Sequence, residues 1–121
     1  MNMTYQDCME FLAKAKCAKK GRPVAKATRM KLTLFTWQPP HAIVVYHKTC
    51  IVEWTPNKTV FTNGGYMTRT TKSRLNEYLP SGYRIHQVGG EWLLTTPEST
   101  QQRWLDKYFL LKFTPEGELI D

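Results

Sequence analysis

A chain of 121 residues in which 41% of the side chains are hydrophobic fits one domain with a modest core, and this composition excludes a disordered chain. No apolar run approaches the roughly 20 residues of a membrane-spanning helix, and the polar, acidic N-terminus lacks the pattern of a signal peptide. The net charge of +7 favours an anionic partner, namely a nucleic acid, a nucleoprotein or a phosphorylated small molecule. A basic face that only keeps the protein in solution would explain the charge equally well.

The charge is uneven along the chain. Residues 1–35 hold eight Lys and Arg against two acidic residues, whereas residues 98–121 hold three against five. A second small basic cluster lies at residues 69–74. The three cysteines are odd in number and widely spaced, so they predict neither a disulfide framework nor a zinc site, and they indicate a reducing, cytoplasmic setting.

Residues 4–19 predict an amphipathic helix. Thr4 with Asp7 resembles a capping pair, apolar side chains recur at helical spacing, and Gly21 would cap the far end. Residues 19–29 lack periodicity and predict an exposed basic connection. Its cations are candidate contacts for an anionic partner, and they are Lys19, Lys20, Arg22 and Arg29.

Four strands are predicted in the next part of the chain. Residues 30–37 alternate in polarity, and residues 42–47 and 50–54 are rich in β-branched side chains and joined by a short link. Residues 59–62 form the fourth strand after a turn.

The stretch "NGGYMTRTTKSRLNEYL", residues 63–79, predicts a corner between a strand and a helix. Its glycines can take positive φ, and its threonines can cap the helix. Backbone N–H groups at such a corner can bind an anion. The alternative is a purely structural corner in which Arg74 pairs with Glu77 on the helix. The candidate anion site comprises Gly64, Gly65, Arg69, Thr70, Thr71, Lys72 and Arg74.

The rest of the chain predicts two hairpins. Residues 83–96 turn at a glycine pair, and residues 108–120 turn at Pro-Glu-Gly. Residues 97–107 fit a short helix or a polar loop equally well. The sequence therefore predicts a single domain over residues 1–121 of the α+β class: a curved antiparallel sheet with a basic N-terminal helix and one inserted helix.

No catalytic or metal-binding spacing is visible, although catalytic triads also assemble from distant positions. We therefore expect a protein that is not an enzyme and needs no metal or cofactor. Glu53 would be the first candidate for catalysis, but an outward-facing strand residue is the simpler explanation. Tyr66 and Tyr83 flank the basic helix and are the aromatic side chains predicted to stack on bases.

Several motifs resemble a family of small proteins from bacteriophages and other mobile elements. They are GRP…TR at residues 21–29, His-x-Thr at residues 47–49, T-x-x-x-N-G-G-Y-x-T-x-T-T-K-x-R-L-N at residues 59–76, and a Tyr-Arg strand with a Gly-x-Trp hairpin at residues 83–92. Cys50 stands where relatives often have an acidic residue. The resemblance implies an accessory role in the cytoplasm of a bacterial host, and it carries no established activity.

Three functions fit these observations. The leading hypothesis is non-catalytic binding to a nucleic acid or nucleoprotein, as by an inhibitor of a host defence complex such as a CRISPR system. The second is binding of a nucleotide or another phosphorylated small molecule at Gly64, Gly65, Thr70, Thr71 and Lys72. The third is a structural or self-associating phage component that assembles through exposed sheet edges. None of the three involves a membrane.

Overall fold

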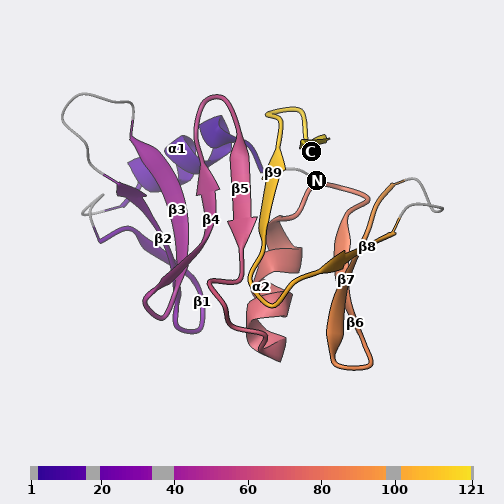
Figure 1. Ribbon diagram of the computed structural model, residues 1–121. Coiled ribbons are helices and arrows are strands. Elements are labelled where there is room, and N and C mark those ends of the chain that lie inside the picture. Colours follow the sequence, from indigo (N-terminus) through magenta and orange to yellow (C-terminus); the bar gives the residue numbers. More distant parts are fainter. Residues whose placement is uncertain (1–2, 16–19, 34–39, 98–101, 121) are drawn as a thin grey trace.

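The computed structural model describes residues 3–15, 20–33, 40–97 and 102–120, in which two helices and ten strands lie as in Figure 1. The helices are α1 (Tyr5–Ala13) and α2 (Arg69–Tyr78). The strands are β1 (Arg22–Ala25), β2 (Thr28–Thr33), β3 (His41–Tyr46), β4 (Thr49–Trp54), β5 (Thr59–Thr62), β6 (Arg84–Val88), β7 (Glu91–Thr95), β8 (Gln102–Leu105), β9 (Leu110–Phe113) and β10 (Leu119–Ile120). Neither helix in these ranges is long and apolar enough to cross a membrane.

The strands form two antiparallel sheets. The main sheet is open and has the order β1-β2-β3-β4-β5-β9-β10, and the small sheet has the order β6-β7-β8. The predicted α+β class, with antiparallel strands, an N-terminal helix and one inserted helix, is confirmed. The division into two sheets goes beyond the prediction, which placed all strands in one sheet.

Both helices pack on the same face of the main sheet. Trp54 of β4 contacts them both, because its indole N–H donates to the carbonyl oxygen of Met3 just before α1 at 3.1 Å, and its ring meets Tyr78 of α2 edge-on at 5.5 Å. The predicted capping pair begins α1, since Thr4 and Asp7 exchange both hydrogen bonds of a capping box.

The core lies between this face of the sheet and the helices. It contains apolar side chains that are at most 9% exposed, among them Cys8, Leu12, Met30, Val44, Val52, Trp54, Phe61, Leu75, Trp92, Leu111 and Phe113. Leu75 and Thr71 of α2 are the inward members of the helical stripe that the sequence predicts.

The N-terminal segment differs from its prediction in two ways. Helix α1 ends at Ala13 and its C-cap is Lys14, so Gly21 does not cap it. Gly21 instead precedes β1 at a φ of +70°, where a Cβ would overlap the carbonyl oxygen of Met30. The predicted basic connection is also wrong at residues 22–25, because these residues form β1 and pair with β2. Lys19 lies outside the described residues.

Residues 102–105 form strand β8, which is neither the helix nor the loop that the sequence allowed. Its side chains give little alternation, because Leu105 is buried whereas Trp104 is 57% exposed. The strand is defined by its pairing with β7, in which Leu105 lies opposite Trp92. A pairing of this kind leaves no periodic signal in the sequence.

Candidate nucleic-acid interface

Three connections meet at one end of the main sheet, which is the lower end in Figure 1. They are the turn at residues 26–27, the turn at residues 47–48, and the loop from β5 to α2 at residues 63–68. The first two are joined directly, because the amide of His47 donates to the carbonyl oxygen of Ala27 at 2.8 Å. We call this end of the sheet the turn end.

The turn end holds two residues in an unfavourable backbone conformation. Ala27 has a φ of +54° and His47 a φ of +56°, and within the described ranges they are the non-glycine residues with positive φ. This left-handed region costs an L-residue about 1–2 kcal/mol, and such residues cluster at functional sites. The strain therefore marks this end of the molecule as a candidate functional region.

The loop after β5 is fixed by Asn63, which is fully buried. Its side-chain oxygen accepts from the amide of Gly65 at 2.9 Å, and its side-chain nitrogen donates to the carbonyl oxygen of Lys107 at 2.7 Å. Gly64 has a φ of +62°, and a Cβ there would overlap Thr49 Cγ2. The glycine pair therefore allows the loop to pass close to β4 while Asn63 attaches it to the turn between β8 and β9.

Helix α2 begins at this loop. Thr68 is its N-cap, and the Thr68 hydroxyl accepts from the amide of Thr71 at 3.2 Å. The Thr71 side chain is buried and lies 2.7 Å from the Thr68 hydroxyl. Thr71 therefore stabilises the corner, as the structural alternative predicted, while the exposed Thr70 remains at the surface.

A cavity of about 490 Å³ opens between the loop and the sheet. We call it the threonine cavity, and it is lined by Tyr46, His47, Lys48, Thr49, Ile51, Asn63, Tyr66, Thr68, Thr70 and Thr71. Two of the motifs behind the family resemblance, at residues 47–49 and 59–76, thus meet here from distant parts of the sequence.

A second cavity of about 370 Å³ adjoins the turn end. We call it the lysine cavity, and its lining residues are Lys20, Pro23, Ala25, Ala27, Thr28, Arg29, Lys31, Val45 and His47. Three cations and no carboxylate line it, which gives it a positive potential. His47 lines both cavities and so marks the place where they meet.

The basic cluster on α2 divides into two parts. Arg69 is exposed, and Lys72 makes a long hydrogen bond of 3.4 Å to Gln87 of β6; both line a shallow depression of about 320 Å³. Arg74 instead donates to the Thr28 hydroxyl at 3.1 Å and to Glu77 at 3.1 Å, and its side chain is 17% exposed. Arg74 therefore links α2 to β2, whereas Arg69 is exposed and Lys72 is half-buried beside β6.

The residues predicted to bind a nucleotide or another phosphorylated small molecule do not line one common site. Thr70 and Thr71 line the threonine cavity, whereas Lys72 lines the depression on another side of α2. Gly64 and Gly65 shape the loop beside the cavity without lining it.

The N-terminal cations also have structural contacts. Arg22 donates to the carbonyl oxygen of Phe11 at 2.9 Å and lies 4.0 Å above the Phe11 ring, so it holds β1 against α1. Arg29 donates to the carbonyl oxygens of Lys20 and Gly21, both at 3.0 Å. Lys20 and Arg29 remain exposed and meet at the lysine cavity.

The two aromatic candidates have different roles. Tyr66 is 58% exposed, whereas Tyr83 packs edge-on against Phe113 at 4.9 Å and its hydroxyl accepts from the amide of Leu119 at 3.3 Å. Tyr108 is 57% exposed and its ring approaches Gly65, the sequence neighbour of Tyr66. The sequence analysis missed Tyr108 because its segment predicted only a hairpin.

We call the following set of side chains the basic aromatic surface: Lys48, Tyr66, Lys107 and Tyr108 at the turn end, with Arg69 and Lys72 on the neighbouring side of α2. Two acidic residues lie close to these cations: Asp106 is in the same turn as Lys107, and Glu77 lines the depression with Arg69 and Lys72. The sequence analysis also missed Lys48 and Lys107, since single lysines in turns give no signal until the fold brings the turns together.

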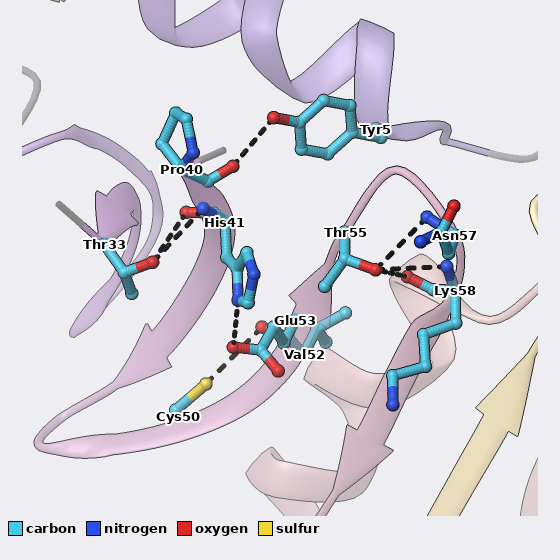
Figure 2. Close-up of polar contacts among 10 residues, drawn as sticks. All are labelled: Tyr5, Thr33, Pro40, His41, Cys50, Val52, Glu53, Thr55, Asn57 and Lys58. Atoms are coloured by element: carbon cyan, nitrogen blue, oxygen red, sulfur yellow. Dashed lines mark hydrogen bonds and ion pairs between the residues drawn. The ribbon is translucent and has the colours of Figure 1, made fainter. Parts of the chain in front are cut away.

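A histidine–carboxylate pair lies elsewhere, on β3 and β4. Figure 2 shows His41 and Glu53 pointing toward each other, with His41 Nδ1 3.0 Å from a Glu53 carboxylate oxygen. Cys50 is exposed as a residue, but its thiol donates to the carbonyl oxygen of Val52 at 3.6 Å. Partial burial of the thiol, with a contribution from the charge of Glu53, raises the pKa of Cys50 to about 11.

The Cys50 thiol is therefore protonated at neutral pH and is a poor nucleophile. Among the described residues, no three His, Cys, Asp or Glu side chains come close enough together to hold a metal ion.

Comparison with known proteins identifies the family. No curated protein and no solved structure matches the chain. Residues 12–111, which are most of the chain, match the family described as Kyanoviridae Gp96 protein. The expected origin in a bacteriophage family is thereby confirmed, and the chain belongs to the Kyanoviridae Gp96 family of phage proteins.

Proposed function

We propose that this phage protein is an accessory protein that binds a nucleic acid, alone or within a nucleoprotein, through the basic aromatic surface and without catalysis. The observation that carries the proposal is the exposure of Tyr66 and Tyr108 near Gly65, together with cations from two turns and helix α2. Exposed aromatic rings and neighbouring cations are the two kinds of side chain that single-stranded nucleic acids bind.

The chemistry of this surface suits a phosphate backbone with accessible bases. Lysine and arginine side chains bind phosphates, and aromatic rings stack on unpaired bases at about 1–3 kcal/mol per base. Arg69 is exposed on the first turn of α2, within a few residues of Tyr66. The surface therefore offers both kinds of contact at neighbouring positions.

Two observations favour binding over catalysis. The Cys50 thiol is protonated at neutral pH, and His41 and Glu53 are joined by a hydrogen bond away from the strained turn end. A phage protein of this kind would act on the nucleic acids or nucleoproteins of its host. A defence complex that contains guide RNA or target DNA is one such partner, and family membership supports this only through the phage origin.

The test is binding of nucleic acid by protein freed of bound nucleic acid with nuclease and high salt. Fluorescence anisotropy with labelled single-stranded and duplex DNA and RNA should show binding at low salt. The logarithm of the binding constant should then fall linearly with the logarithm of the salt concentration. Each neutralised phosphate contributes about −0.7 to this slope for single strands and about −0.9 for duplex DNA.

The Arg69→Ala/Lys72→Ala variant should reduce the magnitude of this slope by roughly 1.4 for single strands or 1.8 for duplex DNA. The matched control is Lys58→Ala/Lys112→Ala, which removes two exposed charges away from the turn end. Equal effects of the two variants would show that only net charge matters. No binding to any of the four nucleic acids at low salt, and none to a host nucleoprotein in a pull-down from host lysate, would refute the proposal.

A further inference from the structure

The threonine cavity combines an apolar interior with a polar rim. Ile51, which is 1% exposed, and the ring of Tyr46 supply apolar surface, while threonine side chains line other parts of the wall. Its volume of about 490 Å³ falls within the range of roughly 300–1,000 Å³ that is usual for small-molecule sites. The cavity is therefore large enough to enclose a planar ring system.

Polar groups in the wall are available to a ligand. Within the described part of the chain, the hydroxyls of Thr49, Tyr66 and Thr70 make no hydrogen bond to protein. Asn63 differs, because its side-chain amide is already bonded to Gly65 and Lys107. A ligand in this cavity would thus meet hydroxyl groups, each of which can both donate and accept a hydrogen bond.

A nucleobase matches this wall. Its faces are flat and apolar, its edge carries both donors and acceptors, and tyrosine rings such as Tyr66 stack on it. An aliphatic side chain of a protein partner would leave the hydroxyls without partners, which carries a desolvation cost.

The position of His47 adds a place for phosphate. His47 lines the threonine cavity and the lysine cavity, and Lys20, Arg29 and Lys31 line the latter without an opposing carboxylate. The hydrogen bond from its amide to Ala27 holds the His47 backbone at the junction, where its φ is +56°. A ring held in the threonine cavity would therefore have cationic side chains beyond the His47 junction.

We propose that the threonine cavity binds one unpaired nucleobase, with its flanking phosphate directed toward His47 and the lysine cavity. This inference rests on the proposed function and makes it more specific, since it selects single strands over duplexes. The base can come from a single-stranded nucleic acid or from a free nucleotide, and the test distinguishes these two sources.

The test uses Thr70→Trp, which would fill the cavity without changing charge. Thr70 is the second residue of α2 after its threonine N-cap, and it is exposed. Gln6 is the second residue of α1 after its threonine N-cap and is also exposed, so Gln6→Trp is the matched control. Both variants should fold, which circular dichroism checks.

The probe is a single strand of about 12 nucleotides, within the range that single-strand-binding domains cover, with one 2-aminopurine in its sequence. The parent protein and Gln6→Trp should bind this strand more tightly than its duplex and should change the 2-aminopurine fluorescence. Thr70→Trp should weaken single-strand binding at least fivefold, which corresponds to about 1 kcal/mol at 25 °C. Duplex binding should weaken less than single-strand binding, because a duplex offers no unpaired base to the cavity.

A second arm titrates mononucleoside monophosphates. A rise in the melting temperature of the parent but not of Thr70→Trp would support the cavity and identify a free nucleotide as a sufficient ligand. Binding of the strand without any effect of mononucleotides would identify the polymer as the source.

Equal affinity for single strand and duplex, with Thr70→Trp behaving as Gln6→Trp, would overturn the base cavity while leaving nucleic-acid binding intact. Absence of binding to every nucleic acid would instead refute the proposed function itself, and the two failures are therefore distinguishable.

Discussion

The division of the basic cluster on α2 can be tested by removing its two parts separately. Arg74→Ala removes the guanidinium that joins α2 to the buried Thr28 hydroxyl and to Glu77. Arg69→Ala/Lys72→Ala removes two cations with no short contact to the rest of the described protein, since the bond from Lys72 to Gln87 is 3.4 Å long. The first change should affect stability, and the second should affect binding.

The magnitudes follow from these contacts. A hydrogen bond from a charged donor is worth about 1.5–3 kcal/mol, and an exposed ion pair about 0.2–1 kcal/mol. Arg74→Ala should therefore lower the free energy of unfolding by about 2–4 kcal/mol. At about 3–5 °C per kcal/mol for a chain of this length, Tm should fall by roughly 6–20 °C. Exposed substitutions change stability by about 0.5 kcal/mol or less each, so the double variant should lose less than roughly 5 °C.

The assay is thermal unfolding by circular dichroism, with urea unfolding as a check, followed by anisotropy binding at fixed salt. A double variant that melts as far below the parent as Arg74→Ala does would show that the whole cluster is structural. An Arg74→Ala variant that melts like the parent would show that the contact with Thr28 does not stabilise the fold.

Three further predictions concern the loop, the core and the aromatic residues. Gly64→Ala should destabilise more than Gly90→Ala in urea unfolding, because both glycines have positive φ but only a Cβ at Gly64 meets a neighbour, Thr49; equal losses would contradict the close approach. Burial, assisted by the charge of Asp7, raises the pKa of Cys8 from 9.0 to about 12, so the folded state retains this proton while the unfolded state loses it. Stability should therefore be insensitive to this thiol below pH 9 and fall between about pH 9 and 12, which urea midpoints would show as a smaller decline in Cys8→Ala. Tyr66→Ala should keep the parent Tm and weaken binding, and a large loss of Tm would place Tyr66 in the core instead.

Much of the fold follows from local signals in the sequence. Side-chain alternation, the capping pair at Thr4 and the glycine pair at residues 89–90 each report on a few neighbouring residues. The structure agrees with all three over the described residues, while residues 34–37 of the strand predicted from alternation lie outside them. Strand β1 was missed because Pro23 and its charged neighbours hide a pairing that depends on β2. Strand β8 was missed because its exposed Trp104 removes the alternation of a half-buried strand.

The candidate site was less predictable than the fold. Arg69 and Lys72 could be placed on the outer side of a helix by spacing alone, but the role of Arg74 depends on Thr28, which lies far away in sequence. The meeting of the turn at residues 47–48 with the loop after β5 depends on the register of β4 and β5. Such tertiary pairing cannot be read from a local pattern, so Lys48 and Tyr108 entered the site only through the structure.

The most direct test of the basic aromatic surface is a residue-resolved titration of the ¹⁵N-labelled protein with a single-stranded oligonucleotide, followed by amide chemical shifts. The account predicts that the largest shifts fall at residues 47–49, 64–69 and 107–108, that they saturate together, and that they diminish as salt is raised. Large shifts confined to the region of His41 and Glu53, or an unchanged spectrum at low salt with excess oligonucleotide, would contradict it.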